Sequence, residues 1–293
     1  MAFLPFFISK QKKLNVVIIG GGYAGIAAMT TLLRHAPDSS ITLIDPKTHH
    51  LKITHLHETF RYPLTDLLVP FTDIEQRYGC RHIPASTHFD AEALQQCQQT
   101  QQLLVNEELL YFDYLLIASG CENRTSDHAE NVLSLQDFTG TAGSELLTQA
   151  FVRNHPSEQS ISVVGGGATG IQFLFEIKQF LNRIKSKATL RLIHSGDRVL
   201  EQFPRGFDTY VQARMMELDI AFHPNTYYRQ QQSTHLLLAE KHTQKQFELT
   251  SGLTVLLLGK SQRPSFTANA FGQVLVDQKS LPNTFVAGHC SVY

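Results

Sequence analysis

A phosphate-binding fingerprint occurs twice in this chain of 293 residues, and the repeat constrains the fold more than any other feature. The two copies are Gly20-x-Gly22-x-x-Gly25, after the apolar run 16–19, and Gly165-x-Gly167-x-x-Gly170, after the apolar run 161–164. In such a strand-to-helix turn the first glycine permits the tight turn and the second lets the backbone approach a pyrophosphate. The third lets the helix and the strand pack closely, and the amide groups at the start of the helix stabilise the anion. Two copies therefore predict two dinucleotide sites in one chain.

An acidic residue usually follows such a fingerprint by about 20 positions, at the end of the next strand, where it bonds the ribose hydroxyls. Asp45 meets this expectation, because it ends the strand-like run 41–44. The matching run 190–193 ends at His194 instead. Histidine does not offer the charged acceptor pair of a carboxylate. The second site is therefore either an NADPH site that tolerates a 2′-phosphate, or a relaxed or lost nucleotide site.

The elements that follow each fingerprint also repeat, with a period of about 145 residues. Residues 103–105 and 109–111 predict an antiparallel hairpin, and residues 114–120 predict a buried strand that ends in glycine. Residues 235–238, 246–249 and 253–259 repeat this order. The fold class is therefore α/β, with two Rossmann-like domains, the second inserted in the first, and an antiparallel hairpin or meander beside each parallel sheet. We expect the Gln-rich stretch 95–102 to be a solvated turn and residues 122–130 to cross between the domains.

Composition excludes several other classes. The net charge is −1, from 25 basic and 26 acidic residues, so we expect no large field of one sign and no nucleic-acid partner. The four cysteines form no C-x-x-C pair, which favours reduced thiols and a cytoplasmic protein. No apolar run is long enough to predict a transmembrane segment. The apolar start, residues 1–8, is followed by basic residues, so it is either a surface-packed terminus or a weak peripheral membrane contact.

With both halves in view, the chain resembles the flavoproteins with two dinucleotide-binding domains. Within them it is most similar to type II NADH dehydrogenases, FAD-dependent pyridine nucleotide oxidoreductases whose relatives include apoptosis-inducing-factor-like oxidoreductases and sulfide:quinone reductases. The motifs that carry the resemblance are VIIGGGYAG at 17–25, YLLIASG at 114–120, VVGGGATG at 163–170, SGDRVL at 195–200 and NTFVAGH at 283–289.

The resemblance implies an FAD-dependent NAD(P)H oxidoreductase that passes hydride from nicotinamide to flavin, and electrons on to a quinone or another small acceptor. It implies a discontinuous FAD-binding domain over residues 1–124 and 262–293, and an NAD(P)H-binding domain over residues 125–261. The residues expected at the FAD are Gly20, Gly22, Tyr23, Ala24, Gly25, Asp45, Pro46, Lys47, Ala118, Ser119, Gly120, Gly288 and His289. Those expected at NAD(P)H are Gly165, Gly167, Ala168, Thr169, Gly170 and His194. No catalytic residue is assigned, because the cofactors carry hydride chemistry themselves.

The chain departs from the family pattern at four places. His194 replaces the usual acidic residue, Gln172 replaces a usual glutamate while Glu176 keeps the later one, and His289 replaces the aspartate of the Gly-Asp motif that bonds the flavin ribityl chain. The chain is also C-terminally short, because relatives continue past the position of Tyr293 with a domain that covers the flavin ring. The flavin ring would therefore be open to solvent unless a partner subunit covers it. The alternative is a degenerate, non-catalytic nucleotide-binding relative that acts as an interaction or sensor module.

A few other residues have two interpretations. Histidines are dense in the loop after Asp45, at positions 49, 50, 55 and 57. Since no ligand spacing accompanies them, we expect no metal and favour an exposed or flavin-adjacent loop over a metal site. Cys121 is expected to be a passive thiol rather than one that reacts with sulfide. Glu201 and Arg205 are expected to be surface charges.

Overall fold

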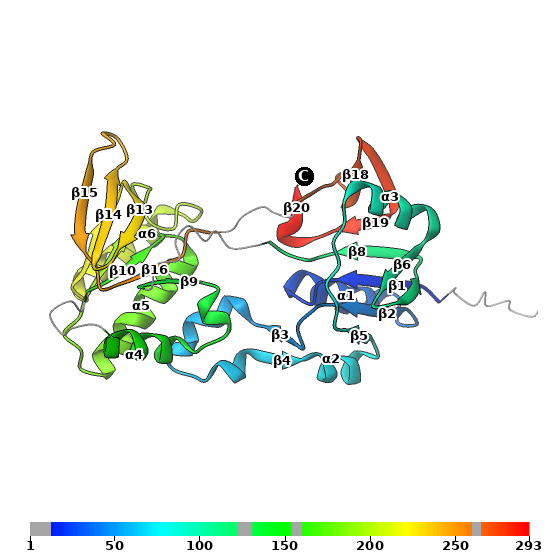
Figure 1. Cartoon of the computed structure of the whole chain (residues 1–293), viewed down its shortest axis with the longest axis horizontal. Helices are drawn as coiled ribbons and strands as arrows, with labels where there is room; N and C mark the ends of the chain where they lie inside the picture. The colour runs from blue at the N-terminus through cyan, green and yellow to red at the C-terminus, as the bar shows by residue number, and fades with distance from the viewer. Residues whose placement is uncertain (1–12, 122–130, 154–159, 260–264, 293) are drawn as a thin grey trace, which may run out of the picture. The chain divides into compact units, whose positions relative to one another are not determined.

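The chain forms two compact units, each built on its own sheet (Figure 1). The structure is a computed structural model that describes residues 13–121, 131–153, 160–259 and 265–292. Unit 1 comprises residues 1–50, 69–121 and 262–293, and unit 2 comprises residues 51–68 and 122–261. Two segments with sequence-based predictions lie outside the described residues. They are residues 1–12, with a surface-packed terminus or a weak membrane contact as the alternatives, and residues 122–130, with a predicted crossover between the domains.

The sheet of unit 1 has the strand order β18-β19-β8-β1-β2-β5 and is parallel except for its edge strand β18. Its strands are β1 (Asn15–Ile19), β2 (Ser40–Ile44), β5 (Arg81–Ile83), β8 (Tyr114–Ile117), β18 (Gln273–Val276) and β19 (Lys279–Val286). The central strand β1 reads as a continuous apolar run because both of its faces are buried: Val16 and Ile18 face one cluster, and Val17 and Ile19 the other.

Each cluster of unit 1 is covered by different elements. Helices α1 (Tyr23–His35) and α2 (Phe71–Tyr78) pack on the Val16 and Ile18 side through Met29 and Ile74. The elements on the other side are α3 (Ala91–Thr100) and the hairpin of β6 (Gln102–Val105) and β7 (Glu108–Tyr111). The short strands β17 (Phe266–Thr267) and β20 (Ser291–Val292) pair in parallel, and a 3-10 turn spans Gly288–Cys290. The hairpin predicted at residues 103–111 is therefore confirmed.

The Gln-rich stretch is a helix rather than a turn, so that prediction was wrong over residues 95–100. Helix α3 begins after Asp90, whose Oδ1 accepts a hydrogen bond from the Ala93 N–H at 2.8 Å. Leu94 and Cys97, three positions apart on one helix face, are buried. Glutamine is a good helix former, so an N-cap and two buried positions are enough to order this segment.

Unit 2 repeats the arrangement. Its parallel sheet has the order β12-β11-β10-β16-β9, and a separate antiparallel sheet has the order β13-β14-β15. The strands are β9 (Val132–Ser134), β10 (Ser160–Val164), β11 (Thr189–Ile193), β12 (Ile220–His223), β13 (Thr226–Gln232), β14 (His235–Glu240), β15 (Gln246–Thr250) and β16 (Leu253–Leu256). The helices are α4 (Gly143–Arg153), α5 (Ala168–Arg183) and α6 (Arg205–Glu217), with a 3-10 turn at Asp137–Thr139. The predicted α/β class is confirmed.

A short excursion of the chain supplies part of the core of unit 2. Strands β3 (His49–Leu51) and β4 (Leu68–Pro70) pair where the chain leaves unit 1 and returns, and 3-10 helices span Ile53–Phe60 and Leu64–Leu67 between them. Phe60 is 1% exposed and packs among the rings of Phe138, Phe173 and Phe180. Residues 51–68 thus belong to unit 2, although the sequence-based division groups them with the first domain. The assignment of a cofactor to each domain remains a prediction.

Candidate functional site

The first fingerprint forms a turn in which two glycines are required by packing and one is not. Gly20 has φ +101°, and a Cβ added to it would lie 2.3 Å from the Ala118 carbonyl oxygen. A Cβ on Gly25 would lie 1.9 Å from the Gly20 oxygen. A Cβ on Gly22, by contrast, would meet no atom within 4 Å. Gly22 therefore faces open space at the start of α1, where a phosphate would gain access to the backbone.

Asp45 braces this turn through its carboxylate. Oδ2 accepts a hydrogen bond from the Gly21 N–H at 2.7 Å, and Oδ1 accepts one from the Lys47 N–H at 2.9 Å. A carboxylate has about four lone-pair sites, so acceptor capacity remains for ribose hydroxyls. Pro46 and Lys47 are exposed beside it.

Aromatic rings pack against the fingerprint turn at Gly21, and sequence reasoning did not predict them. A Cβ on Gly21 would lie 2.2 Å from the Phe71 ring, and the His82 ring stacks on Phe71 with centroids 4.4 Å apart. His82 donates from Nε2 to the Asp45 carbonyl oxygen at 3.0 Å. His50, buried and edge-on to Tyr23, donates from Nδ1 to the Gly21 oxygen at 2.8 Å. One member of the histidine cluster therefore holds the fingerprint turn.

The remaining residues predicted for the first site reach the same turn from distant parts of the chain. The Ala118 N–H donates to the Ile19 oxygen at 2.7 Å, and Gly120, two residues on, has φ +77°. Gly288 has φ +82°, and a Cβ on it would lie 2.7 Å from the Ala24 Cβ. The structure thus brings residues 20–25, 45–47, 118–120 and 288–289 toward one end of the sheet of unit 1.

The second fingerprint reproduces the first at the level of atoms. Gly165 has φ +122°, and a Cβ on it would lie 2.3 Å from the Leu257 oxygen. A Cβ on Gly170 would lie 1.8 Å from the Gly165 oxygen, while one on Gly167 would meet nothing within 4 Å. A cavity of about 240 Å³ opens here, lined by Gly167, Ala168, Thr169, Gly170, Leu135, Gln202 and residues 256–259. Leu135, Gln202 and residues 256–259 were not predicted for this site. The repeated strand that ends in glycine, at Gly259, was a sequence signal for residues 256–259.

His194 occupies the place in unit 2 that Asp45 holds in unit 1. Its Nδ1 accepts a hydrogen bond from the Gly166 N–H at 3.1 Å, which leaves the proton of the neutral ring on Nε2. Burial lowers the pKa of His194, and the nearby Glu201 carboxylate, with Oε1 3.8 Å from Nε2, partly opposes this. His194 is therefore a neutral acceptor near pH 7, with its acceptor nitrogen engaged by the backbone.

Two other polar residues, His55 and Arg61, contact acidic side chains. His55 bonds Glu58 at 3.1 Å, and Arg61 donates from Nε to Glu176 at 2.9 Å, while Gln172 is exposed. Within the described ranges, no group of three or more His, Cys, Asp or Glu residues is arranged to hold a metal ion. The described helices include none with the length and apolar character needed to cross a membrane.

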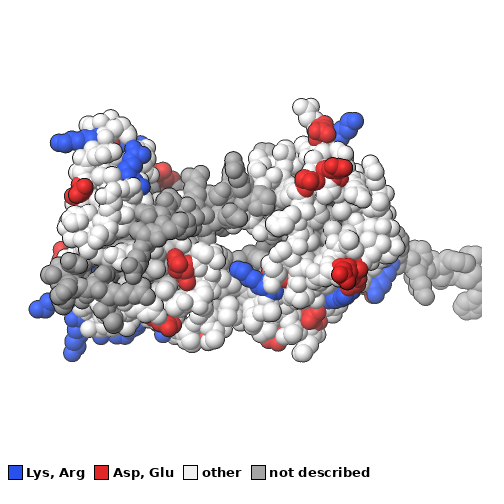
Figure 2. All heavy atoms as spheres, in the orientation of Figure 1, with Lys and Arg blue, Asp and Glu red and all other residues white. Residues whose placement is uncertain are grey.

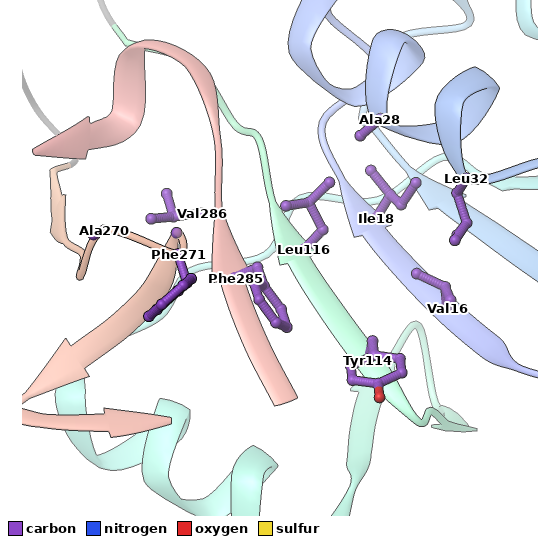
Figure 3. Close-up of a pocket in the computed structure, with 11 residues that line it drawn as sticks. Val16, Ile18, Ala28, Leu32, Tyr114, Leu116, Ala270, Phe271, Phe285 and Val286 are labelled. Carbon is purple, nitrogen blue, oxygen red and sulfur yellow. The ribbon is translucent and has the colours of Figure 1, made fainter. Parts of the chain in front are cut away.

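A hollow of about 740 Å³ in unit 1 lies on one face of the sheet beside α1 (Figure 3). Its walls are Val16, Ile18, Ala28, Leu32, Tyr114, Leu116, residues 270–272, Phe285 and Val286. None of these residues carries a charge, and most of the walls are apolar side chains. On the face in Figure 2, acidic and basic side chains are interspersed over both units, in line with the net charge of −1.

Comparison with known proteins gives one family. The family described as pyridine nucleotide-disulphide oxidoreductase matches residues 14–292. A type II NADH:quinone oxidoreductase of Staphylococcus aureus (strain NCTC 8325 / PS 47) is 24% identical over 317 residues, covering 97% of this chain and 76% of that protein.

Two solved structures share the fold. NDH2 from Plasmodium falciparum in complex with NADH has a TM-score of 0.78 at 16% identity, over 96% of this chain and 65% of that one. The sulfide:quinone oxidoreductase from Aquifex aeolicus has a TM-score of 0.77 at 17% identity, over 95% and 69%. This chain therefore spans about two thirds of the Plasmodium chain.

Proposed function

Because this chain belongs to the pyridine nucleotide-disulphide oxidoreductase family, we propose that it is an FAD-dependent NAD(P)H oxidoreductase that delivers electrons to a quinone or another small acceptor. The quinone is proposed because the curated relative named above and one of the two structural neighbours are quinone oxidoreductases by name. The acceptor and a cytoplasmic location remain predictions.

The observation that carries the proposal is that the second glycine of each fingerprint, Gly22 or Gly167, faces open space. In both turns the outer glycines are locked against backbone oxygens, while Gly22 and Gly167 have no neighbour within 4 Å of an added Cβ. A chain that only needed tight strand-to-helix turns has no packing reason to keep glycine at these two positions. A backbone that must approach a diphosphate does have one.

The residues of unit 1 suit FAD. Gly22 and the start of α1 would receive the pyrophosphate, and the free lone pairs of Asp45 would accept from the adenosine ribose. Gly288 and His289 would stand near the flavin side of the nucleotide. His289 offers a neutral ring where an aspartate would offer a charged acceptor, so we expect weaker FAD retention than a Gly-Asp pair would give.

The residues of unit 2 suit NAD(P)H. Gly167, Ala168 and Thr169 line the cavity at the start of α5 and would receive its pyrophosphate. When bound, the two cofactors supply hydride transfer from nicotinamide to flavin, and no residue needs to act as a nucleophile. The protein residues bind and orient the cofactors, and the neutral His194 keeps the turn closed through Gly166.

The test is direct. The purified chain, with added FAD if it is colourless, should show flavin absorbance, and anaerobic NADH or NADPH should bleach it. A short-chain quinone should then restore the absorbance, and steady-state nucleotide oxidation should depend on that quinone. A protein that takes up no FAD would refute the enzyme proposal and favour a non-catalytic nucleotide-binding relative. Bleaching without quinone turnover would leave the first step standing and assign another acceptor.

A further inference from the structure

The second nucleotide site lacks an acceptor for the adenosine ribose at the expected place. A carboxylate at the end of the second strand normally bonds the ribose hydroxyls. In unit 2 that position is His194, and its acceptor nitrogen Nδ1 is used by the Gly166 N–H. Its other nitrogen, Nε2, carries the proton and is covered by its surroundings. His194 has no acceptor left for a diol.

A different carboxylate reaches the same place. Glu201 Oε1 lies 3.8 Å from His194 Nε2, beyond direct hydrogen-bond distance but within electrostatic contact. The Glu201 side chain is 54% exposed, so it keeps acceptor capacity on its solvent side. Glu201 is thus a carboxylate beside the end of β11, although its position in the sequence had suggested an ordinary surface charge.

Contacts made by the loop of residues 196–203 hold Glu201 beside the end of β11. A Cβ on the buried Gly196 would lie 1.8 Å from Glu201 Oε1, so only glycine leaves room for the carboxylate against the backbone. Arg198 donates from its guanidinium to the carbonyl oxygens of Glu201 and Phe203. The Leu200 N–H donates to the Gly166 oxygen at 2.8 Å, which ties the loop to the fingerprint turn.

We infer that Glu201 is the ribose-binding and specificity-determining residue of the second site, that His194 positions it, and that the site therefore prefers NAD(H) to NADP(H). This rests on the proposed function, since it names which pyridine nucleotide unit 2 binds. A ribose diol donates hydrogen bonds to a carboxylate, whereas a 2′-phosphate would bring a second negative charge beside it. The neutral His194 does not offset that charge. Lys241, whose field reaches His194, and Arg198, whose guanidinium bonds the Glu201 carbonyl oxygen, are nearby cations that would favour the opposite preference.

The experiment measures binding rather than turnover. The full chain is titrated by calorimetry with NAD⁺ and with NADP⁺, which cannot reduce a flavin. NAD⁺ should bind about ten-fold or more tightly than NADP⁺. Glu201→Gln should weaken NAD⁺ by about ten-fold, the loss of one charge-assisted hydrogen bond, and narrow the gap to NADP⁺. Gly196→Ala should do the same while keeping the charge, because its methyl group displaces the carboxylate.

Glu217→Gln is the matched control. It removes the same charge at the end of α6, just before β12 begins, whereas Glu201 follows the end of β11, and it should leave both affinities unchanged. Unchanged NAD⁺ affinity in Glu201→Gln, or tighter NADP⁺ than NAD⁺ in the parent chain, would overturn the inference while the proposed function stands. Absence of binding by both nucleotides to the parent chain would overturn both.

Discussion

Substitutions at two glycines three residues apart, Gly22 and Gly25, should separate an effect on cofactor binding from an effect on folding. Gly22→Ala places its methyl group where nothing lies within 4 Å, at φ −75° and ψ −173°, a conformation open to any residue. Gly25→Ala places its methyl group 1.9 Å from the Gly20 carbonyl oxygen, and a backbone oxygen cannot swing aside as a flexible side chain can. An alanine side chain therefore has room at position 22 but clashes with the backbone at position 25.

The magnitudes follow from this geometry. Reduced unfolded-state entropy stabilises Gly22→Ala by up to about 1 kcal/mol, and the weaker N-cap preference of alanine opposes this, so the free energy of unfolding should stay within about 1 kcal/mol. Overpacking should make Gly25→Ala less stable by about 3 kcal/mol. In Gly22→Ala the methyl group blocks the approach of the pyrophosphate to the backbone. We expect FAD affinity to fall by about ten- to a hundred-fold, the equivalent of one charge-assisted hydrogen bond.

The assay combines urea unfolding with FAD titration. The chain contains no tryptophan, so unfolding is followed by circular dichroism. Flavin content after purification and a titration with FAD give the affinity. Gly167→Ala and Gly170→Ala repeat the comparison for the pyridine nucleotide in unit 2. If Gly22→Ala folds normally and keeps the parent affinity for FAD, the interpretation of Gly22 as a phosphate-facing position is refuted.

Three further results are expected. Phe60→Ala should lower the free energy of unfolding by about 3–5 kcal/mol, because Phe60 is 1% exposed among three other rings. The control Tyr62→Ala, at a position that is 51% exposed, should change it by less than about 1 kcal/mol. Equal urea midpoints for the two variants would contradict this prediction. Stability should fall as the pH drops below about 6.5, because burial lowers the pKa of three histidines and the unfolded chain then binds protons that the folded chain refuses. These histidines are His57, His194 and His223. A urea midpoint that is the same at pH 7.5 and pH 5.5 would count against their burial. A thiol reagent should modify Cys121, which is partly exposed, before the other thiols, and it should modify the rest only after urea is added. Rapid modification of every thiol in the folded chain would show that the burial assigned to the other three is wrong. The other thiols are Cys80, Cys97 and Cys290.

The parts of the fold that sequence reasoning recovered are those decided within a few residues. The fingerprint turn needs glycine at Gly20 because φ is +101° there, and such a requirement is visible in the residue itself. The strand that follows α1 and its terminal Asp45 are found by spacing alone. The hairpin at residues 103–111 is likewise a local pattern of two apolar runs around a short polar turn.

The parts that escaped sequence reasoning depend on contacts between distant residues. Nothing in the composition of residues 51–68 shows that Phe60 packs on rings more than 70 positions away. The support of Gly21 by Phe71 and His50 is of the same kind. Glu201 was interpreted as a surface charge because the space above Gly196 exists only once the loop has folded. The role of a polar side chain was therefore less predictable than the path of the backbone beneath it.

Because residues 51–68, which carry Phe60, pack in unit 2, they limit how the chain can be divided into fragments and affect its folding during synthesis. A fragment cloned as residues 122–261 would lack the ring that fills the space between Phe138, Phe173 and Phe180 and the guanidinium that pairs with Glu176. It should be poorly soluble unless residues 51–68 are supplied, for instance by fusion through a linker. During synthesis, residues 51–68 leave the ribosome before the segments that carry Phe138, Phe173 and Phe180. Their apolar side chains stay exposed until those segments follow, and we expect chaperones to bind them in this interval.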